Sequence, residues 1–167
     1  MKSNKKGLST IVATLLIILL TLVAVGIIWV VIRGVVRDST DQVDIDSKCL
    51  AASVEATRVV LDTTPDPDEY LVTITRTGGD DALGGVKLVF TASDGSSNAV
   101  IDWDLTGTGT HAPLPALGSR QIPIQVGSDT NQIPSDLNPT MVSVVVYFLD
   151  TSNNPQLCST ANAYTFG

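Results

Sequence analysis

The sequence predicts an α+β chain in which a long hydrophobic α-helix precedes an Ig-like antiparallel β-sandwich of about seven strands. Two observations carry this prediction. No residue from Leu8 to Ile32 is ionisable, and a helix of that length runs about 37 Å, more than the roughly 30 Å hydrocarbon thickness of a bilayer. Beyond about Cys49 the pattern changes to alternating apolar and polar residues, which is typical of half-buried strands.

The hydrophobic segment is longer than the apolar core of about 7–15 residues in a secretory signal. Its only candidate cleavage sequence, Ala24-Val25-Gly26, is followed by further apolar residues, which argues against cleavage there. A buried core helix that is apolar on every face would need a larger protein around it. We therefore expect a helix that spans a membrane or lies in a helical bundle.

A basic leader ends in a glycine directly before the apolar segment. Lys5, Lys6 and Gly7 are followed at once by Leu8 and then by the sequence Ser-Thr-Ile-Val-Ala-Thr-Leu-Leu. This junction resembles the class III signal peptide of type IV pilins, and the apolar sequence is most similar to archaeal pilin-like proteins. The resemblance covers residues 1 to about 45. It implies that a prepilin peptidase cuts after Gly7 on the cytoplasmic side, where the lysines retain the leader.

One position departs from the bacterial pattern. Bacterial pilins carry a glutamate at the fifth mature position, which here is Val12. Archaeal relatives often lack this acid, so the departure is compatible with the archaeal branch. The chain also lacks the glycine-rich start of archaellins, which favours an adhesive or structural pilus over a rotary archaellum. A plain single-pass anchor with a basic inner flank is the alternative interpretation of the same residues.

In a filament, helices of many copies would cover one another. Small residues allow close approach of helices, and large apolar residues fill the space between them. A helix that merely faces lipid is equally apolar all round, so the pattern leaves both environments open. We expect filament-core packing at Ala13, Leu15, Leu16, Ile18, Leu19, Leu22, Ala24, Gly26, Ile27 and Trp29.

The composition divides the chain into a leader (1–7), a hydrophobic helix with an amphipathic extension (8–46) and an extracellular sandwich domain (47–167). All 17 acidic residues lie after Arg37. Residues 34–167 hold six lysines or arginines against these 17 acids, a net formal charge of −11. Such a surface argues against nucleic acid or anionic lipid as a partner.

Alternating patterns and turn signals mark the strands of the sandwich. Residues 141–149 are almost wholly apolar and predict a central strand covered on both faces. Turn-forming residues such as Asp94-Gly95 and Asn153-Asn154-Pro155 separate the segments. The expected strands are 54–61, 70–75, 86–92, 98–103, 121–126, 141–149 and 159–166.

The chain has two cysteines, Cys49 before the first strand and Cys158 at the start of the last. An even pair in an extracellular domain favours a disulfide. The bond would clamp the last strand to the helix junction and contribute up to about 4.7 kcal/mol in the chain-entropy model. Two unrelated buried thiols are the alternative.

Signals for catalysis, metals and cofactors are weak. The one histidine, His111, lies in a glycine-rich segment that we expect to be a flexible exposed loop, and no enzyme activity or cofactor is expected. The acidic residues Asp62, Asp66, Asp68 and Glu69 do not fit the standard calcium pattern, so a solvated loop is favoured and calcium is the alternative.

The sequence therefore predicts a structural subunit of an archaeal type IV pilus-like filament, involved in adhesion or surface contact. Its expected partners are other copies of itself, the membrane before assembly, the prepilin peptidase and the pilus assembly machinery. The precursor would sit in the cell membrane with a cytoplasmic N-terminus. The alternative is a single-pass anchored sandwich that binds a partner at the cell surface without polymerising.

Overall fold

The computed structural model describes residues 5–64 and 67–167, and it leaves undescribed the side chains of residues 5–10 and 36–41. Residues 1–4 of the expected leader and Asp66 thus lie outside the described residues. The chain divides into two compact units, Met1–Gln42 and Val43–Gly167. Each unit is described by itself.

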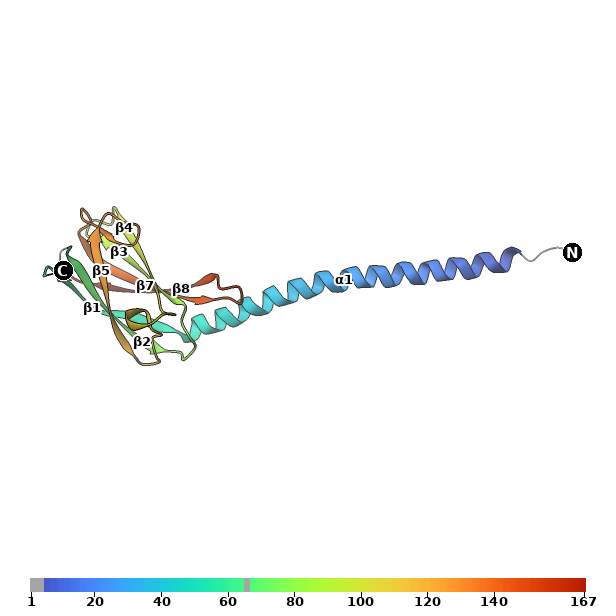
Figure 1. Ribbon diagram of the computed structural model, residues 1–167, viewed down its shortest axis with the longest axis horizontal. Helices are drawn as coiled ribbons and strands as arrows, with labels where there is room; N and C mark the ends of the chain where they lie inside the picture. Colours follow the sequence, from blue (N-terminus) through green and yellow to red (C-terminus); the bar gives the residue numbers. More distant parts are fainter. Residues whose placement is uncertain (1–4, 65–66) are drawn as a thin grey trace. The chain divides into compact units, whose positions relative to one another are not determined.

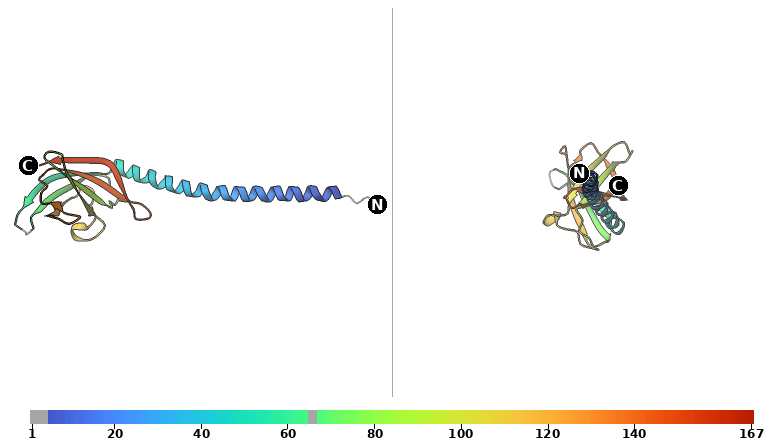
Figure 2. Two further views of the ribbon diagram at one scale, coloured as in Figure 1. Left: turned by 90° about the horizontal axis from the view of Figure 1, so that it is seen from above. Right: turned by 90° about the vertical axis from the view of Figure 1, so that its right-hand side faces the viewer.

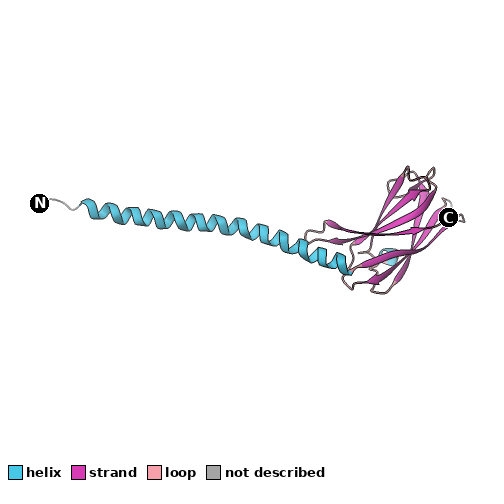
Figure 3. Cartoon of the chain, turned by 180° about the vertical axis from the view of Figure 1, so that it is seen from behind, coloured by secondary structure: helices cyan, strands magenta, loops and turns pink. Residues whose placement is uncertain are grey.

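The helix α1 comprises Lys5–Ala51 and is drawn as one uninterrupted helix (Figure 3). It continues five residues beyond the predicted end at 46, so that Cys49 is helical. No glycine or proline occurs after Gly34 in this segment, and Ser47 to Ala51 contain no residue that would break a helix. The last part, from Val43, belongs to the second compact unit.

The second unit is a sandwich of two four-stranded sheets, which confirms the predicted fold class. The strand order is β1-β2-β5-β6 in one sheet and β4-β3-β7-β8 in the other (Figure 1). Figure 2 shows the same strands from two further directions. The bounds are β1 Ser53–Asp62, β2 Glu69–Gly78, β3 Gly85–Ala92, β4 Asn98–Asp104, β5 Ser119–Gly127, β6 Ile133–Pro134, β7 Pro139–Leu149 and β8 Pro155–Thr165.

The eighth strand is the one that the sequence did not predict. Strand β6 has only two residues and pairs in parallel with Val126 and Gly127 of β5, whereas the other pairings are antiparallel. Two residues carry no readable alternation, so periodicity could not reveal this strand. Its pairing extends the first sheet only beside the end of β5.

The core lies between the two sheets and is built from the alternating apolar positions. Val72 and Ile74 of β2 and Leu88 and Phe90 of β3 belong to one core cluster, and all four are fully buried. Burial of one such side chain contributes about 1.5–3 kcal/mol. This alternation, inward on one face and outward on the other, is the pattern that the sequence predicts.

Strand β7 departs from the prediction of a strand covered on both faces. It is central in its sheet, between β3 and β8. Val142, Val144 and Val146 are buried on the inner face, but Met141 and Val145 are only half-buried. Because a two-layer sandwich covers each sheet on one face, Met141 and Val145 on the outer row are less buried than the inner row. The prediction holds only near the end of the strand, where Tyr147 on the outer row is also buried.

Candidate functional site

The first unit contains a long, mainly apolar stretch of helix that is exposed. Among the described residues, α1 is the one helix long and apolar enough to cross a membrane, over Ile11–Val35. Every side chain in this segment is solvent-exposed, including Leu20, with 70% of its surface free. We call Ile11–Val35 the apolar segment. None of it is buried by the parts of the chain that the structure describes.

All ten predicted packing residues lie on this apolar segment, and all of them are exposed. The structure therefore brings none of them into a core of the chain itself. Gly26 illustrates this, because a Cβ added there would meet nothing within 4 Å. A glycine inside a helix costs about 1 kcal/mol relative to alanine, and no contact with another described residue accounts for its presence.

The hydroxyl groups of the apolar segment bond to the helix's own backbone. Thr14 Oγ1 donates to the Ile11 carbonyl at 2.9 Å, and Thr21 Oγ1 donates to the Ile18 carbonyl at 2.8 Å. A hydroxyl that is satisfied in this way needs no water, because its one donor already has an acceptor. The segment is thus suited to an apolar environment despite its threonines.

The predicted processing residues, Lys5, Lys6, Gly7 and Leu8, lie in the first turns of α1. Their side chains are outside the described residues, and cleavage after Gly7 stays a prediction.

The predicted disulfide is confirmed. Cys49 in the last turn of α1 is bonded to Cys158 in β8, with an S–S distance of 2.03 Å and a Cα–Cα distance of 5.3 Å. The two residues are 109 positions apart in sequence. Disulfides persist in oxidising compartments, so this bond indicates an extracellular setting for the sandwich.

Apolar and ionic contacts support the same end of the helix. Ile45 and Ala52 are buried in the sandwich core on either side of Cys49. Lys48 Nζ donates to Asp44 Oδ2 at 2.5 Å, one helical turn away, and this bond raises the pKa of Lys48. The helix end is therefore tied to the sandwich covalently and by burial.

A buried arginine in β2 forms hydrogen bonds to the backbone of two loops. It is not among the residues predicted to be functional. Arg76 in β2 is 2% exposed and donates to three backbone carbonyls: Gly78 at 3.1 Å, Asp81 at 2.7 Å and Leu114 at 3.1 Å. Its position had a readable signal, because residue 76 shares the inward face with Val72 and Ile74. The guanidinium thus provides a donor to the buried Leu114 carbonyl and to the partly buried bonds at Gly78 and Asp81.

The segment around His111 lies in an exposed loop between β4 and β5, as predicted, but the loop carries specific contacts that the sequence did not indicate. Gly109–His111 forms a 3₁₀ turn, and the His111 ring stacks on Trp103 with centroids 4.3 Å apart and planes 9° from parallel. Trp103 Nε1 donates to the Thr110 carbonyl at 3.2 Å. Arg120 donates to the carbonyls of Thr110, Ala112 and Pro113. These bonds fix the segment against β4 and β5.

The acidic loop after β1 forms a local turn. Asp62 Oδ1 accepts hydrogen bonds from Thr64 N at 2.9 Å and Thr64 Oγ1 at 2.6 Å, and these bonds lower the pKa of Asp62. Asp66 lies outside the described residues, while Asp68 is exposed and Glu69 begins β2. Within residues 5–64 and 67–167, no three His, Cys, Asp or Glu side chains are grouped to hold a metal ion.

Comparisons with known proteins add little. No protein-family model matches the chain, and no curated protein matches it. A solved structure with a detectable likeness is an X-ray structure of a Northeast Structural Genomics Consortium target. It has 14% sequence identity and a TM-score of 0.35, with 72% of this chain and 88% of that chain covered. This likeness is too distant to indicate a function.

Proposed function

We propose that the chain is a structural subunit of an archaeal type IV pilus-like filament, cleaved after Gly7 and polymerised through its N-terminal helix. The observation that supports this most strongly is the apolar segment, which is exposed along its whole length. It stands directly after a junction that resembles the class III signal peptide.

The energetics require a cover for the apolar segment. Exposing about 20 apolar side chains to water costs tens of kcal/mol at about 25 cal/mol per Å². Lipid supplies the cover before assembly, and helices of neighbouring subunits supply it afterwards. Gly26 and Gly34 favour the second cover, because both lack any neighbour within 4 Å of an added Cβ and would admit a closely packed helix.

The sandwich would form the outer sheath. Its acidic surface repels other anionic surfaces and keeps neighbouring domains solvated. Any pull on a filament passes from α1 into the sandwich through residues 43–52. The Cys49–Cys158 bond transmits this force from the helix end directly to β8. Burial of Ile45 in the core adds a non-covalent attachment of the helix end to the sandwich. We propose a mechanical and adhesive role for the domain and no catalytic one.

A second candidate is a single-pass anchored module that stays monomeric. The same exposed apolar segment favours it, because its 25 residues also suffice to span a bilayer. The two candidates differ in the fate of the leader and in the fraction where the mature protein is found.

The deciding experiment is N-terminal mass analysis of the native protein from a sheared extracellular fraction. A chain that starts at Leu8 in that fraction supports the filament. An intact leader found only in membranes overturns it in favour of the anchor. The variant Gly7→Leu is expected to retain the leader and to abolish filaments, whereas Ser3→Leu in the same leader serves as the control and leaves both unchanged.

A further inference from the structure

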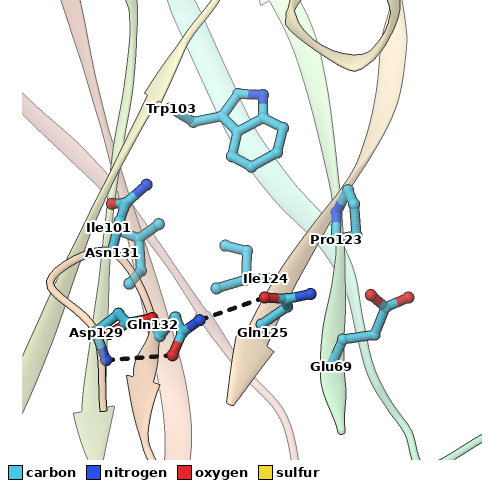
Figure 4. A pocket seen from close by; sticks show the side chains of 9 residues that line it. All are labelled: Glu69, Ile101, Trp103, Pro123, Ile124, Gln125, Asp129, Asn131 and Gln132. Carbon is cyan, nitrogen blue, oxygen red and sulfur yellow. Dashed lines mark hydrogen bonds between the residues drawn. The ribbon is translucent and has the colours of Figure 1, made fainter. Parts of the chain in front are cut away.

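A cleft of about 310 Å³ opens at one edge of the sandwich, between β4 of one sheet and β5 of the other (Figure 4). The opening exists because β4 and β5 are not paired with each other, and because β6 pairs with β5 only at Val126 and Gly127. Ile101 and Ile124 line the cleft and are both buried. The floor of the cleft is therefore apolar.

The loop before β6 forms one wall and is held in place by side-chain amides. Asn131 bonds to the backbone of Asp102 twice: its Oδ1 accepts from Asp102 N at 2.9 Å and its Nδ2 donates to Asp102 O at 3.0 Å. In this way Asn131 takes the place of a neighbouring strand at the edge of β4. The wall is thus fixed in position before any ligand arrives.

Gln132 crosses the cleft from the same loop. Its Oε1 accepts from Asp129 N at 3.2 Å, and its Nε2 donates to Gln125 Oε1 at 3.3 Å (Figure 4). A Cβ added at Gly127 would lie 1.9 Å from Gln132 Oε1. Glycine at this position is what allows the Gln132 amide to lie there.

Trp103 forms the other wall with a fixed orientation. One face of its indole ring is covered by His111, and its N–H is already bonded to Thr110. The part of the ring that lines the cleft offers only carbon and π surface. Such a surface packs against the C–H face of a ring and makes no hydrogen bond of its own.

The polar groups at the opposite end of the cleft have no partners in the described parts of the chain. No hydrogen bond or ion pair there involves the Glu69 carboxylate, the Asp129 carboxylate or Gln125 Nε2. Glu69 and Gln125 are register partners on β2 and β5, so an acceptor and a donor stand side by side. A ligand with several hydroxyl groups would match them, because hydroxyls both donate and accept.

We propose that this cleft binds a neutral saccharide, with one sugar face packed on Trp103 and its hydroxyls bonded to Glu69, Gln125 and Asp129. Anionic ligands are disfavoured by the two carboxylates and by the acidic domain. A calcium ion would need about 6–8 oxygen ligands, more than these two carboxylates supply. An organic cation is disfavoured because recognition of such groups uses a cage of several aromatic rings, and Trp103 is the only aromatic residue that lines the cleft among the described residues. The cleft lies inside the sandwich, so this inference is independent of polymerisation.

The test is a fluorescence titration of the full-length chain in a detergent without a sugar headgroup. The background variant Trp29→Phe leaves Trp103 as the only tryptophan. The probes are neutral oligosaccharides of glucose, galactose and mannose, with sialyllactose and choline as charged comparisons. We expect a saturable change in Trp103 emission with at least one neutral oligosaccharide. Saturation-transfer NMR on the same sugars provides a readout that does not depend on the fluorophore.

The variant Gln125→Ala is expected to weaken that binding roughly threefold to tenfold, which corresponds to one lost hydrogen bond. Gln121→Ala is the matched control, because Gln121 lies on the same strand, is exposed and does not line the cleft. The proposal is overturned if no neutral sugar gives saturable signals in either measurement, or if Gln125→Ala binds as tightly as the control. A response only to choline or sialyllactose also overturns it.

Discussion

The two units of the chain satisfy the same physical requirement in opposite ways. In the sandwich, the apolar side chains of β2, β3, β5 and β7 cover one another and form a closed core. In the apolar segment of α1, every apolar side chain is exposed. The sandwich is therefore complete within one chain, whereas the apolar segment is completed only by lipid or by other molecules.

The two units also differ in how their hydroxyl groups form hydrogen bonds. The hydroxyls of Thr14 and Thr21 bond back to their own helix. In the sandwich, some hydroxyls instead bond across strands, as Thr75 Oγ1 and Ser119 Oγ do at 2.9 Å. Substitutions in the sandwich are thus expected to change its folding stability. Substitutions in the apolar segment are expected to change only interactions with other molecules.

The largest effect on the sandwich is expected from loss of the disulfide. The double variant Cys49→Ser/Cys158→Ser frees a loop with a sequence separation of 109 residues. The chain-entropy model gives a loss of about 4–5 kcal/mol. Urea denaturation monitored by Trp103 fluorescence in a Trp29→Phe background measures it. Ser159→Ala, next to the bond, is the control, and an unchanged midpoint in the double variant would contradict the prediction.

A matched pair of truncations compares the two units directly. Ile74→Ala empties a fully buried site and is expected to cost the sandwich about 3 kcal/mol, within the range of about 2–5 for such changes. Leu20→Ala removes a similar volume from a side chain that is 70% exposed. It is expected to leave the unfolding of the sandwich unchanged. Equal losses in the two variants would mean that the apolar segment belongs to the folding core.

The features that the sequence predicts are those with a local signature. Most of the apolar segment, Ile11–Ile32, is a run without charge, and β2, β3 and β5 alternate with period two. The disulfide was predictable because two cysteines allow one pairing only. The end of α1 was misplaced by five residues, because the segment from Ser47 to Ala51 carries no breaking residue and tertiary contacts determine where it stops.

The cleft could not be predicted because topology assembles it. Its walls come from β2, β4, β5 and the loop at 128–132, which are far apart in sequence. Asn131 and Gln132 have the composition of an ordinary loop, and only the structure shows that they complete the edge of β4 and cross the opening. Arg76 was missed for another reason, since an arginine in an alternating pattern is normally assigned to the solvent face.

Replacement of Arg76 is expected to have an intermediate effect. Arg76→Met keeps most of the volume but leaves the carbonyls of Gly78, Asp81 and Leu114 without their donor. Unsatisfied buried groups cost about 1–3 kcal/mol each, and removal of a buried charge offsets part of that cost. We expect a net loss of about 2 kcal/mol in urea denaturation. Arg58→Met on the exposed face of β1 is the control, and a stabilised Arg76→Met variant would show that the charge is the dominant cost.

The smallest expected effect is a pH dependence of the stability of the sandwich, which arises from four similar turns. Asp62, Asp94, Asp104 and Asp150 each accept a hydrogen bond from the backbone N–H two residues ahead, and these turns share the sequence Asp-x-Ser/Thr. Hydrogen bonds to the ionised carboxylates lower the pKa of all four residues.

A lowered folded-state pKa means that the unfolded chain binds these protons more readily. The stabilisation is therefore fully present above the ordinary aspartate pKa of about 3.9 and is lost as pH falls through the lower folded values. Urea midpoints of the sandwich are expected to decrease modestly below about pH 4. The fourfold variant Asp→Asn at these positions retains one acceptor oxygen in each turn without the titrating charge, so its midpoint should depend less on pH. The apolar segment has no ionisable group between Ile11 and Ile32, so its helicity in detergent should not follow the titration. A parallel loss of helicity would show that the two units respond to pH together and would remove the distinction between them.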